Sequence, residues 1–309
     1  MLPQFLRPRN FDCDLALDGI RQMLWGFFKK VVVADNCALF VNGVFENYQT
    51  LDGSTLFLGA FFFTIQIYGD FSGYSDIAIG CARLFGIDLM QNFKYPYFSR
   101  DIAEFWRRWH ISLTTWFRDY IYIPLGGSRA GKWKSFRNTL VIFLVSGFWH
   151  GANWTFVAWG AYHALLFLPL LLLGQNRRYR DSVAENSFLP SVKELTQMGA
   201  TFLLVLLGWI LFRSEDISQA AVYLERMFNV SLFSAPQLVG LGFGQLLLKK
   251  CFFFTALMFV VEWIGRKQAH GLMIEDLSLP VRYVIYTVLL IIIYGFDASN
   301  PQGFIYFQF

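Results

Sequence analysis

The sequence predicts an all-α, polytopic membrane protein in which some helices are broken or re-entrant. Hydrophobic residues make up 55% of the 309 residues, and the mean hydropathy is +0.42. Charged residues reach only 16%, against about 25% in soluble domains. Several stretches approach the roughly 20 apolar residues that a spanning helix needs. These observations exclude a disordered chain and indicate that the bilayer is the solvent of the helices.

Charge and cysteine content exclude further classes of partner and site. The 26 basic and 22 acidic residues leave a net charge of +4 that is spread along the chain, whereas nucleic-acid binding needs a basic face. The four cysteines form no CxxC pair, and the sequence contains no HExxH motif. We therefore expect no nucleic-acid partner, no disulfide framework and no metal site.

The N-terminal residues include Arg7 and Arg9, but no apolar run of signal-peptide length follows them. We expect no cleavable signal, and a chain that begins on the cytoplasmic side or at a late start. No internal repeat or low-complexity linker is visible, so residues 1–309 are expected to form one domain.

The first long apolar segment, Leu56 to Phe85, is interrupted by Gly69 to Asp76, which contains two carboxylates. Because a carboxylate that faces lipid is energetically unfavourable, we expect a broken helix here, with Asp70 and Asp76 facing the protein interior. Their expected partners are Arg or Tyr side chains from the Lys94 to Arg118 region.

The next element is an amphipathic helix that begins at the capping box Asp101 to Glu104 and continues to about Tyr120. His110 falls at the border of its two faces, where it is either an interfacial histidine or a functional one. One face carries Phe105, Trp106, Trp109, Leu113, Trp116, Phe117 and Tyr120, and the other carries Glu104, Arg107, Arg108, Thr115, Arg118 and Asp119.

A basic run, Arg129, Lys132, Lys134 and Arg137, precedes the following apolar segment. Such a run is either a positive-inside anchor or a patch that attracts the phosphates of a cytoplasmic acyl donor such as acyl-CoA. Both interpretations put this loop in the cytoplasm.

Asn138 to Leu173 contains 36 residues without Asp, Glu, Lys or Arg. One helix of this length would measure about 54 Å, against a hydrocarbon core of roughly 30 Å, so we expect a break at Gly147 to Asn153. His150 would then lie about 18 Å inside the membrane, where an ionisable side chain indicates a functional site. A neutral imidazole there can act as a general base. The alternative is a structural histidine that is bonded to a carbonyl freed by the break.

The remaining histidines give weaker signals: we expect His163 to line a core or a cavity and His270 to be solvated in a polar loop. Gly126 to Ala130 lacks the last glycine of a serine-hydrolase elbow. The C-terminal third is expected to contain conventional spans at Leu195 to Phe212, Cys251 to Ile264 and Val281 to Phe296.

Four strings are long and specific: YGDFSGYSDIA at 68–78, FWRRWHISL at 105–113, WFRDYIYIPLGGS at 116–128 and SGFWHGANW at 146–154. In these strings the sequence resembles the membrane-bound O-acyltransferases and, within them, the alginate O-acetyltransferase branch. The resemblance extends over almost the whole chain, to Tyr306 through Phe309.

The resemblance implies that His150 is catalytic, that His110 is its partner, and that both line a central tunnel joining the two sides of the membrane. It implies transfer of an acetyl group from acetyl-CoA or another cytoplasmic thioester to hydroxyls of an exported, alginate-like polysaccharide, with no bound cofactor. Transfer would be direct or through an extracytoplasmic acetyltransferase partner, and the polysaccharide export machinery would be a further partner. The chain would cross the lipid of the bacterial inner membrane several times. The other residues expected to line or support the tunnel are Asp70, Asp76, Arg107, Arg118, Asp119, Trp149, Asn153 and Trp154.

Family members carry further spans ahead of the region that matches Leu2 to Phe5, so residues 1–309 are expected to be the C-terminal portion of the family's usual chain. The alternatives are a non-enzymatic transporter or channel, a scaffold in an export complex, and an inactive fragment. Donor hydrolysis or acetyl transfer by the purified chain would separate them.

Overall fold

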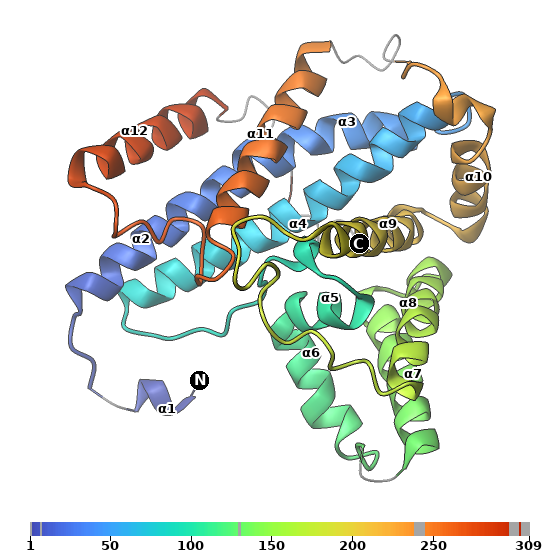
Figure 1. The fold of residues 1–309 in the computed structure, drawn as a ribbon, viewed down its shortest axis with the longest axis horizontal. Helices are drawn as coiled ribbons and strands as arrows, with labels where there is room; N and C mark the ends of the chain where they lie inside the picture. The colour runs from blue at the N-terminus through green and yellow to red at the C-terminus, as the bar shows by residue number, and fades with distance from the viewer. Residues whose placement is uncertain (1, 7, 129–130, 238–244, 297–302, 304–309) are drawn as a thin grey trace. The chain divides into compact units, whose positions relative to one another are not determined.

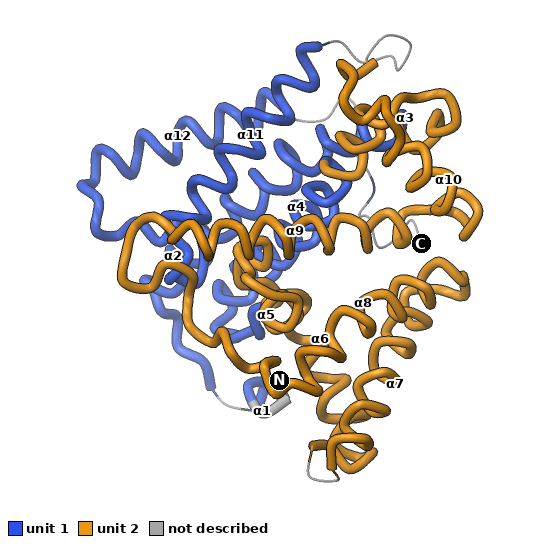
Figure 2. The backbone as a smooth tube through the Cα atoms, turned by 45° about the vertical axis from the view of Figure 1, so that its right-hand side comes forward, with its two compact units in different colours: residues 1–43, 62–91, 238–308 blue, residues 44–61, 92–237, 309 orange. Residues whose placement is uncertain are grey.

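The structure is a computed structural model that describes residues 2–6, 8–128, 131–237, 245–296 and 303 (Figure 1). Helices are the only regular secondary structure among these residues, which confirms the predicted all-α class. The chain divides into two compact units (Figure 2). Unit 1 contains residues 1–43, 62–91 and 238–308, and unit 2 contains residues 44–61, 92–237 and 309.

Unit 1 is built from long helices around a close contact between α2 and α4. Its elements are α1 (Leu2–Phe5), α2 (Cys13–Phe27), a π-helical segment (Phe28–Ala34), most of α3 (Asp35–Glu46) and of α4 (Gly53–Leu84), α11 (Gln245–Ile264) and α12 (Leu279–Gly295). A Cβ atom at Gly26 would lie 2.6 Å from the Gly73 carbonyl oxygen, and one at Gly80 would lie 2.3 Å from that of Gly19. The two backbones therefore approach as closely as glycine alone allows.

The broken helix predicted within Leu56 to Phe85 is wrong, because α4 runs without interruption from Gly53 to Leu84. The glycines that suggested a break instead make room for the neighbouring helix. The carboxylates are neutralised by two consecutive lysines of the π-helical segment: Lys29 Nζ lies 2.6 Å from Asp76 and Lys30 Nζ lies 2.6 Å from Asp70.

The interior position predicted for these carboxylates is confirmed, since Asp70 is 2% exposed and the Asp76 side chain 14% exposed. Their predicted partners are wrong. Lysines of the π-helical segment form the ion pairs, and not Arg or Tyr side chains from 94–118.

Unit 2 contains shorter helices and a helical hairpin. Its main elements are α5 (Ile102–Arg108), α6 (Ile111–Phe117), a π-helical turn (Arg118–Tyr122), α7 (Lys132–His150), α8 (Trp154–Leu172), α9 (Val192–Arg213) and α10 (Ile217–Met227). Asp101 caps α5 by accepting a hydrogen bond from the Glu104 amide (2.7 Å). The Glu104 carboxylate binds Arg100 and Arg108, so it pairs with cations rather than with the cap residue.

The antiparallel hairpin of α7 and α8 confirms the predicted division of the 138–173 segment. Each helix has 19 residues, and the turn between them falls at the expected glycine-containing motif. Gly147 and Gly160 let the helices touch, because a Cβ at Gly147 would lie 2.3 Å from the Phe156 carbonyl oxygen and one at Gly160 the same distance from that of Phe143. This contact fixes the faces that α7 and α8 present to their other neighbours.

Two helices of the described residues, α8 and α9, are long and apolar enough to cross a membrane. The predicted span at Leu195 to Phe212 lies within α9. α12, which contains most of the predicted Val281 to Phe296 span, is apolar but has only 17 residues. The predicted span Cys251 to Ile264 lies within α11, which is not among the candidates.

Candidate active site

His110 lies at a break between α5 and α6, so the continuous helix predicted from Asp101 to about Tyr120 is wrong. Trp109 has an extended backbone (φ −102°, ψ 129°), and His110 has a left-handed one (φ 43°, ψ 55°). A left-handed conformation is uncommon for a residue other than glycine, and such strain gathers at functional sites. The direction of the His110 side chain is therefore set by the break and not by the helical repeat.

Backbone hydrogen bonds from residues 92–94 hold this break. The Ile111 amide donates to the Asn92 carbonyl oxygen (2.9 Å), and the Lys94 amide donates to the Arg108 carbonyl oxygen (3.0 Å). The backbone groups left over at the facing helix ends thus find partners outside both helices.

His150 is the last residue of α7, at the turn of the hairpin. Gly151 follows it with φ 157° and ψ 161°, a region that is essentially restricted to glycine, and a Cβ there would lie 2.8 Å from the Phe156 ring. Asn153 then caps α8 by accepting a hydrogen bond from the Thr155 amide (3.0 Å). The sequence Gly-Ala-Asn after His150 therefore stops one helix and starts the next.

A spanning α8 would be about 28 Å long, close to the roughly 30 Å of the hydrocarbon core. Because α8 begins at Trp154, the hairpin turn then lies at one end of the span. The mid-membrane depth of His150 stays a prediction.

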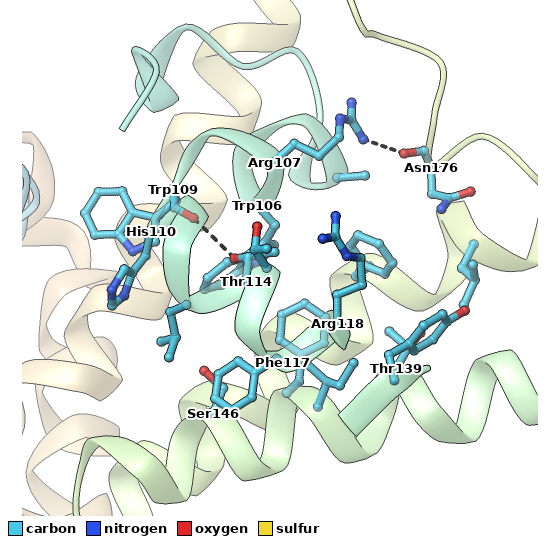
Figure 3. A pocket seen from close by; sticks show the side chains of 18 of the residues that line it. Trp106, Arg107, Trp109, His110, Thr114, Phe117, Arg118, Thr139, Ser146 and Asn176 are labelled. Carbon is cyan, nitrogen blue, oxygen red and sulfur yellow. Dashed lines mark hydrogen bonds between the residues drawn. The ribbon is translucent and has the colours of Figure 1, made fainter. Parts of the chain in front are cut away.

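One cavity of about 370 Å³ in unit 2 is lined by both His110 and His150. Figure 3 shows the cavity from close by, with His110 labelled. Its α7 wall runs from Thr139 to His150, about 17 Å along the helix. Apolar and aromatic side chains form most of its lining, which includes Trp106, Trp109, Leu113, Phe117, Ile142, Phe143, Trp159, Phe167 and Leu171.

Cationic side chains line another part of the same cavity. They are Arg107, Arg118 and Arg177, and Arg107 donates a hydrogen bond to the Asn176 carbonyl oxygen (2.5 Å). Figure 3 shows Arg107 and Arg118 on one side of the cavity and His110 on the other, with Thr114 between them. The cavity thus joins guanidinium groups to the two imidazoles along a mainly apolar wall.

Burial sets the electrostatics of His110, which is 9% exposed. Loss of solvation lowers the pKa of His110 from its ordinary value to about 4. The imidazole is therefore neutral near pH 7, with one nitrogen able to accept a proton and the other able to donate a hydrogen bond.

The structure separates the residues predicted to support the site. Arg107 and Arg118 line the cavity, and the exposed Asp119 binds Arg118 (2.7 Å). Trp149 contacts both histidine rings, at centroid distances of 4.9 Å to His150 and 6.1 Å to His110.

Other predicted residues lie elsewhere in the described chain. Asn153 caps α8, Trp154 is exposed, and Asp70 and Asp76 belong to the charge network of unit 1. In the predicted basic loop, Lys132 and Lys134 are exposed, Arg137 donates to the Asn138 side chain (2.9 Å), and Arg129 lies outside the described residues.

Sequence reasoning missed several lining residues, although one signal could have shown them. Thr139, Phe143, Ser146 and His150 follow one another at steps of four, three and four residues, which places them on one face of a helix. Arg177 and Asn176 follow α8 in an irregular segment, and no local pattern assigns them to the cavity.

The two other histidines are buried. His163 packs among aromatic rings in α8, away from the cavity lining, and among the described residues its ring nitrogens find no hydrogen-bond partner. The prediction that His270 is solvated is wrong, because it is 2% exposed. Its loop folds back so that Nε2 lies 2.9 Å from Asp18 and Nδ1 accepts a hydrogen bond from the Leu272 amide (3.3 Å).

A sequence profile of the membrane-bound O-acyltransferase family matches residues 20–188. The chain belongs to the membrane-bound O-acyltransferase family. The matched region contains every residue that lines the cavity, from Ala103 to Arg177. Family membership also makes the chain a membrane protein, in agreement with its apolar helices.

Several curated relatives in the family share this region. The probable alginate O-acetylase AlgI of Pseudomonas aeruginosa is 40% identical over 245 residues, which cover 78% of this chain and 45% of the relative. The peptidoglycan O-acetyltransferase of Helicobacter pylori is 37% identical over 74% of this chain and 41% of its own. The teichoic acid D-alanyltransferase of Bacillus subtilis is 29% identical over 65% of this chain and 52% of its own. The chain thus spans about half the length of the curated relatives it matches.

Proposed function

We propose that this protein transfers an acyl group, with acetyl as the first candidate, from a cytoplasmic thioester such as acetyl-CoA to hydroxyls of an exported polysaccharide. The observation that carries the proposal is that His110 and His150, which are 40 residues apart in the sequence, line one cavity. The relatives' names support the reaction class, since each names the transfer of an acetyl or D-alanyl group.

The cavity suits a donor that is charged at one end and reactive at the other. Arg107, Arg118 and Arg177 provide positive charge for phosphate groups. The aromatic wall can cover an uncharged arm, and the two imidazoles lie where a thioester at the end of that arm would arrive. A donor of this kind could present its acyl group without crossing the membrane.

Charge along the hairpin supports an orientation for this transfer. Basic residues lie in the first two turns of α7 and follow α8 at the same end of the hairpin, namely Lys132, Lys134, Arg137, Arg177, Arg178 and Arg180. Cytoplasmic loops are enriched in Lys and Arg, so we assign this end to the cytoplasm and the His150 turn to the opposite face. In a bacterium this membrane would be the inner membrane, crossed several times.

In the proposed reaction the His150 imidazole accepts the proton of an acceptor hydroxyl as the oxygen attacks the thioester carbonyl. The carbon–sulfur bond then breaks, the ester remains on the acceptor, and the proton passes to the departing thiolate. His110, or the backbone amides at the hairpin turn, would stabilise the oxyanion. A covalent acyl-His150 intermediate is a variant of the same scheme, and transfer through an extracytoplasmic acetyltransferase partner is another.

The test uses inverted membrane vesicles that contain the chain and enclose alginate, with acetyl-CoA labelled in its acetyl group added outside. We expect label in alkali-labile ester on the enclosed polymer and an equal amount of free thiol outside. Right-side-out vesicles should show neither. Folded protein that releases no thiol and forms no ester would contradict the proposal and favour a transporter or a scaffold in an export complex.

A further inference from the structure

Trp149 lies against both histidines but does not line the cavity. Its ring centroid is 4.9 Å from that of His150 and 6.1 Å from that of His110. The cavity lining includes both imidazoles and leaves the indole out. The indole therefore lies beside the two rings without facing the cavity, and it is 52% exposed.

Charged residues beside the hairpin turn indicate that this end of the hairpin meets water. The Asn153 side chain donates a hydrogen bond to the Glu215 carbonyl oxygen (2.6 Å), which ties the hairpin turn to the end of α9. The carboxylates of Glu215 and Asp216 are both exposed there. Since exposed carboxylates are disfavoured in hydrocarbon, the His150 end of the hairpin lies at an aqueous face.

Water at this face would compete with the acceptor hydroxyl in the proposed reaction. Water that reached a thioester beside His150 could attack its carbonyl in place of the acceptor hydroxyl. The carbon–sulfur bond would break, the thiol would leave with a proton, and the acyl group would be lost as a carboxylic acid. Acyltransferases therefore need to exclude water from the reacting centre.

We propose that Trp149 shields His110 and His150 from water until an acceptor displaces its indole, and so sets the ratio of acyl transfer to donor hydrolysis. The assignment rests on the proposed function for its chemical consequence. The indole suits this task because it is large and flat, and because it lies close to both rings without lining the cavity.

The neighbouring residue provides a matched control. Phe148 is also aromatic, lies in the same turn of α7, and is 66% exposed. It is absent from the cavity lining. Trp149→Phe retains part of the shield, whereas Trp149→Ala removes it.

The experiment measures thiol release from acetyl-CoA by membrane vesicles with and without acceptor polysaccharide. Trp149→Ala should release thiol severalfold faster than wild type without acceptor, and a smaller share of the acetyl group should become ester. Trp149→Phe should fall between, and Phe148→Ala should match wild type. If Trp149→Ala hydrolyses the donor no faster than wild type while wild type forms ester, the role of Trp149 is wrong. If wild type forms no ester, the proposed function itself fails.

A second measurement needs no donor and no turnover. A histidine-acylating reagent added from the aqueous face, with modified peptides identified by mass spectrometry, should label His110 and His150 severalfold faster in Trp149→Ala than in wild type. The buried His163 should stay equally slow in both, which reports that the variant is folded. Equal labelling of His110 and His150 in wild type and variant would overturn the shielding role whether or not the protein is an acyltransferase.

Discussion

Two sets of polar side chains in this protein, one in each unit, differ in what surrounds them. In unit 1, Lys29 pairs with Asp76 and Lys30 pairs with Asp70, while the Tyr68 hydroxyl donates to Glu262 (2.8 Å). In unit 2, His110 and His150 line a cavity and pack against aromatic rings.

The surroundings of each set indicate whether its side chains contribute to stability or can contact a bound molecule. A buried charge that meets an opposite charge is held in one position, and removing its partner is strongly destabilising. A neutral imidazole that lines a cavity can contact a molecule that enters. The rule that ionisable groups in membrane segments mark functional sites treats both sets alike. The structure distinguishes them, because the first set forms ion pairs and the second lines a cavity.

The largest expected effect lies in unit 1. Lys29→Ala leaves the Asp76 carboxylate without its 2.6 Å partner in a buried site, and breaking a buried pair costs about 3–5 kcal/mol of unfolding free energy. Unfolding of the purified protein by a denaturing detergent measures the loss. Lys193→Ala, at an exposed lysine, is the control. Replacing both partners, by Lys29→Met with Asp76→Leu, should recover part of the stability. An unchanged unfolding midpoint in Lys29→Ala would show that the network is not a scaffold.

The opposite result is expected at His110. His110→Ala should slow acyl transfer by about 10²-fold if the imidazole stabilises the oxyanion, while the unfolding midpoint changes little. Because the residue has a left-handed backbone, His110→Asn is the informative companion, since asparagine tolerates this conformation. Both variants should lose activity alike. Wild-type transfer by His110→Asn would mean that the backbone turn and not the imidazole matters.

The smallest effect is expected at the cationic part of the cavity. Arg177 lines the cavity but is exposed, and exposed charge pairs contribute little, so Arg177→Ala should raise the KM for acetyl-CoA by no more than about fivefold. The effect should shrink as salt is added. Arg178→Ala removes a neighbouring charge that does not line the cavity and should leave KM unchanged. Equal KM values for both variants at low salt would remove Arg177 from the donor site.

Local signals predicted the hairpin correctly, because Gly151 and Asn153 interrupt an otherwise apolar run and each has a local role in the turn. The same kind of signal misled at Gly69 to Asp76, where the glycines serve contact with another helix. Only residues more than 40 positions earlier, such as Gly19 and Gly26, distinguish a contact from a break.

Breaks that depend on distant partners escape sequence reasoning for the same reason. The turn at His110 is held by the backbone of residues 92–94, and no sequence pattern between Asp101 and Tyr120 predicts it. His270 was misplaced because its partner, Asp18, lies 252 residues away. The pairing of His110 with His150 came from family resemblance. The structure adds that both line one cavity.

The measurement that tests the central claim most directly compares two histidines of unit 2, the half-buried His150 and the buried His163. Acetyl transfer per folded molecule is measured for wild type, His150→Ala and His163→Leu in the same membranes. If His150 is the general base, His150→Ala should lose at least about 10²-fold in rate with an unchanged unfolding midpoint. His163→Leu, which alters a histidine outside the cavity lining, should transfer at close to the wild-type rate. Near-normal transfer by folded His150→Ala would contradict the account.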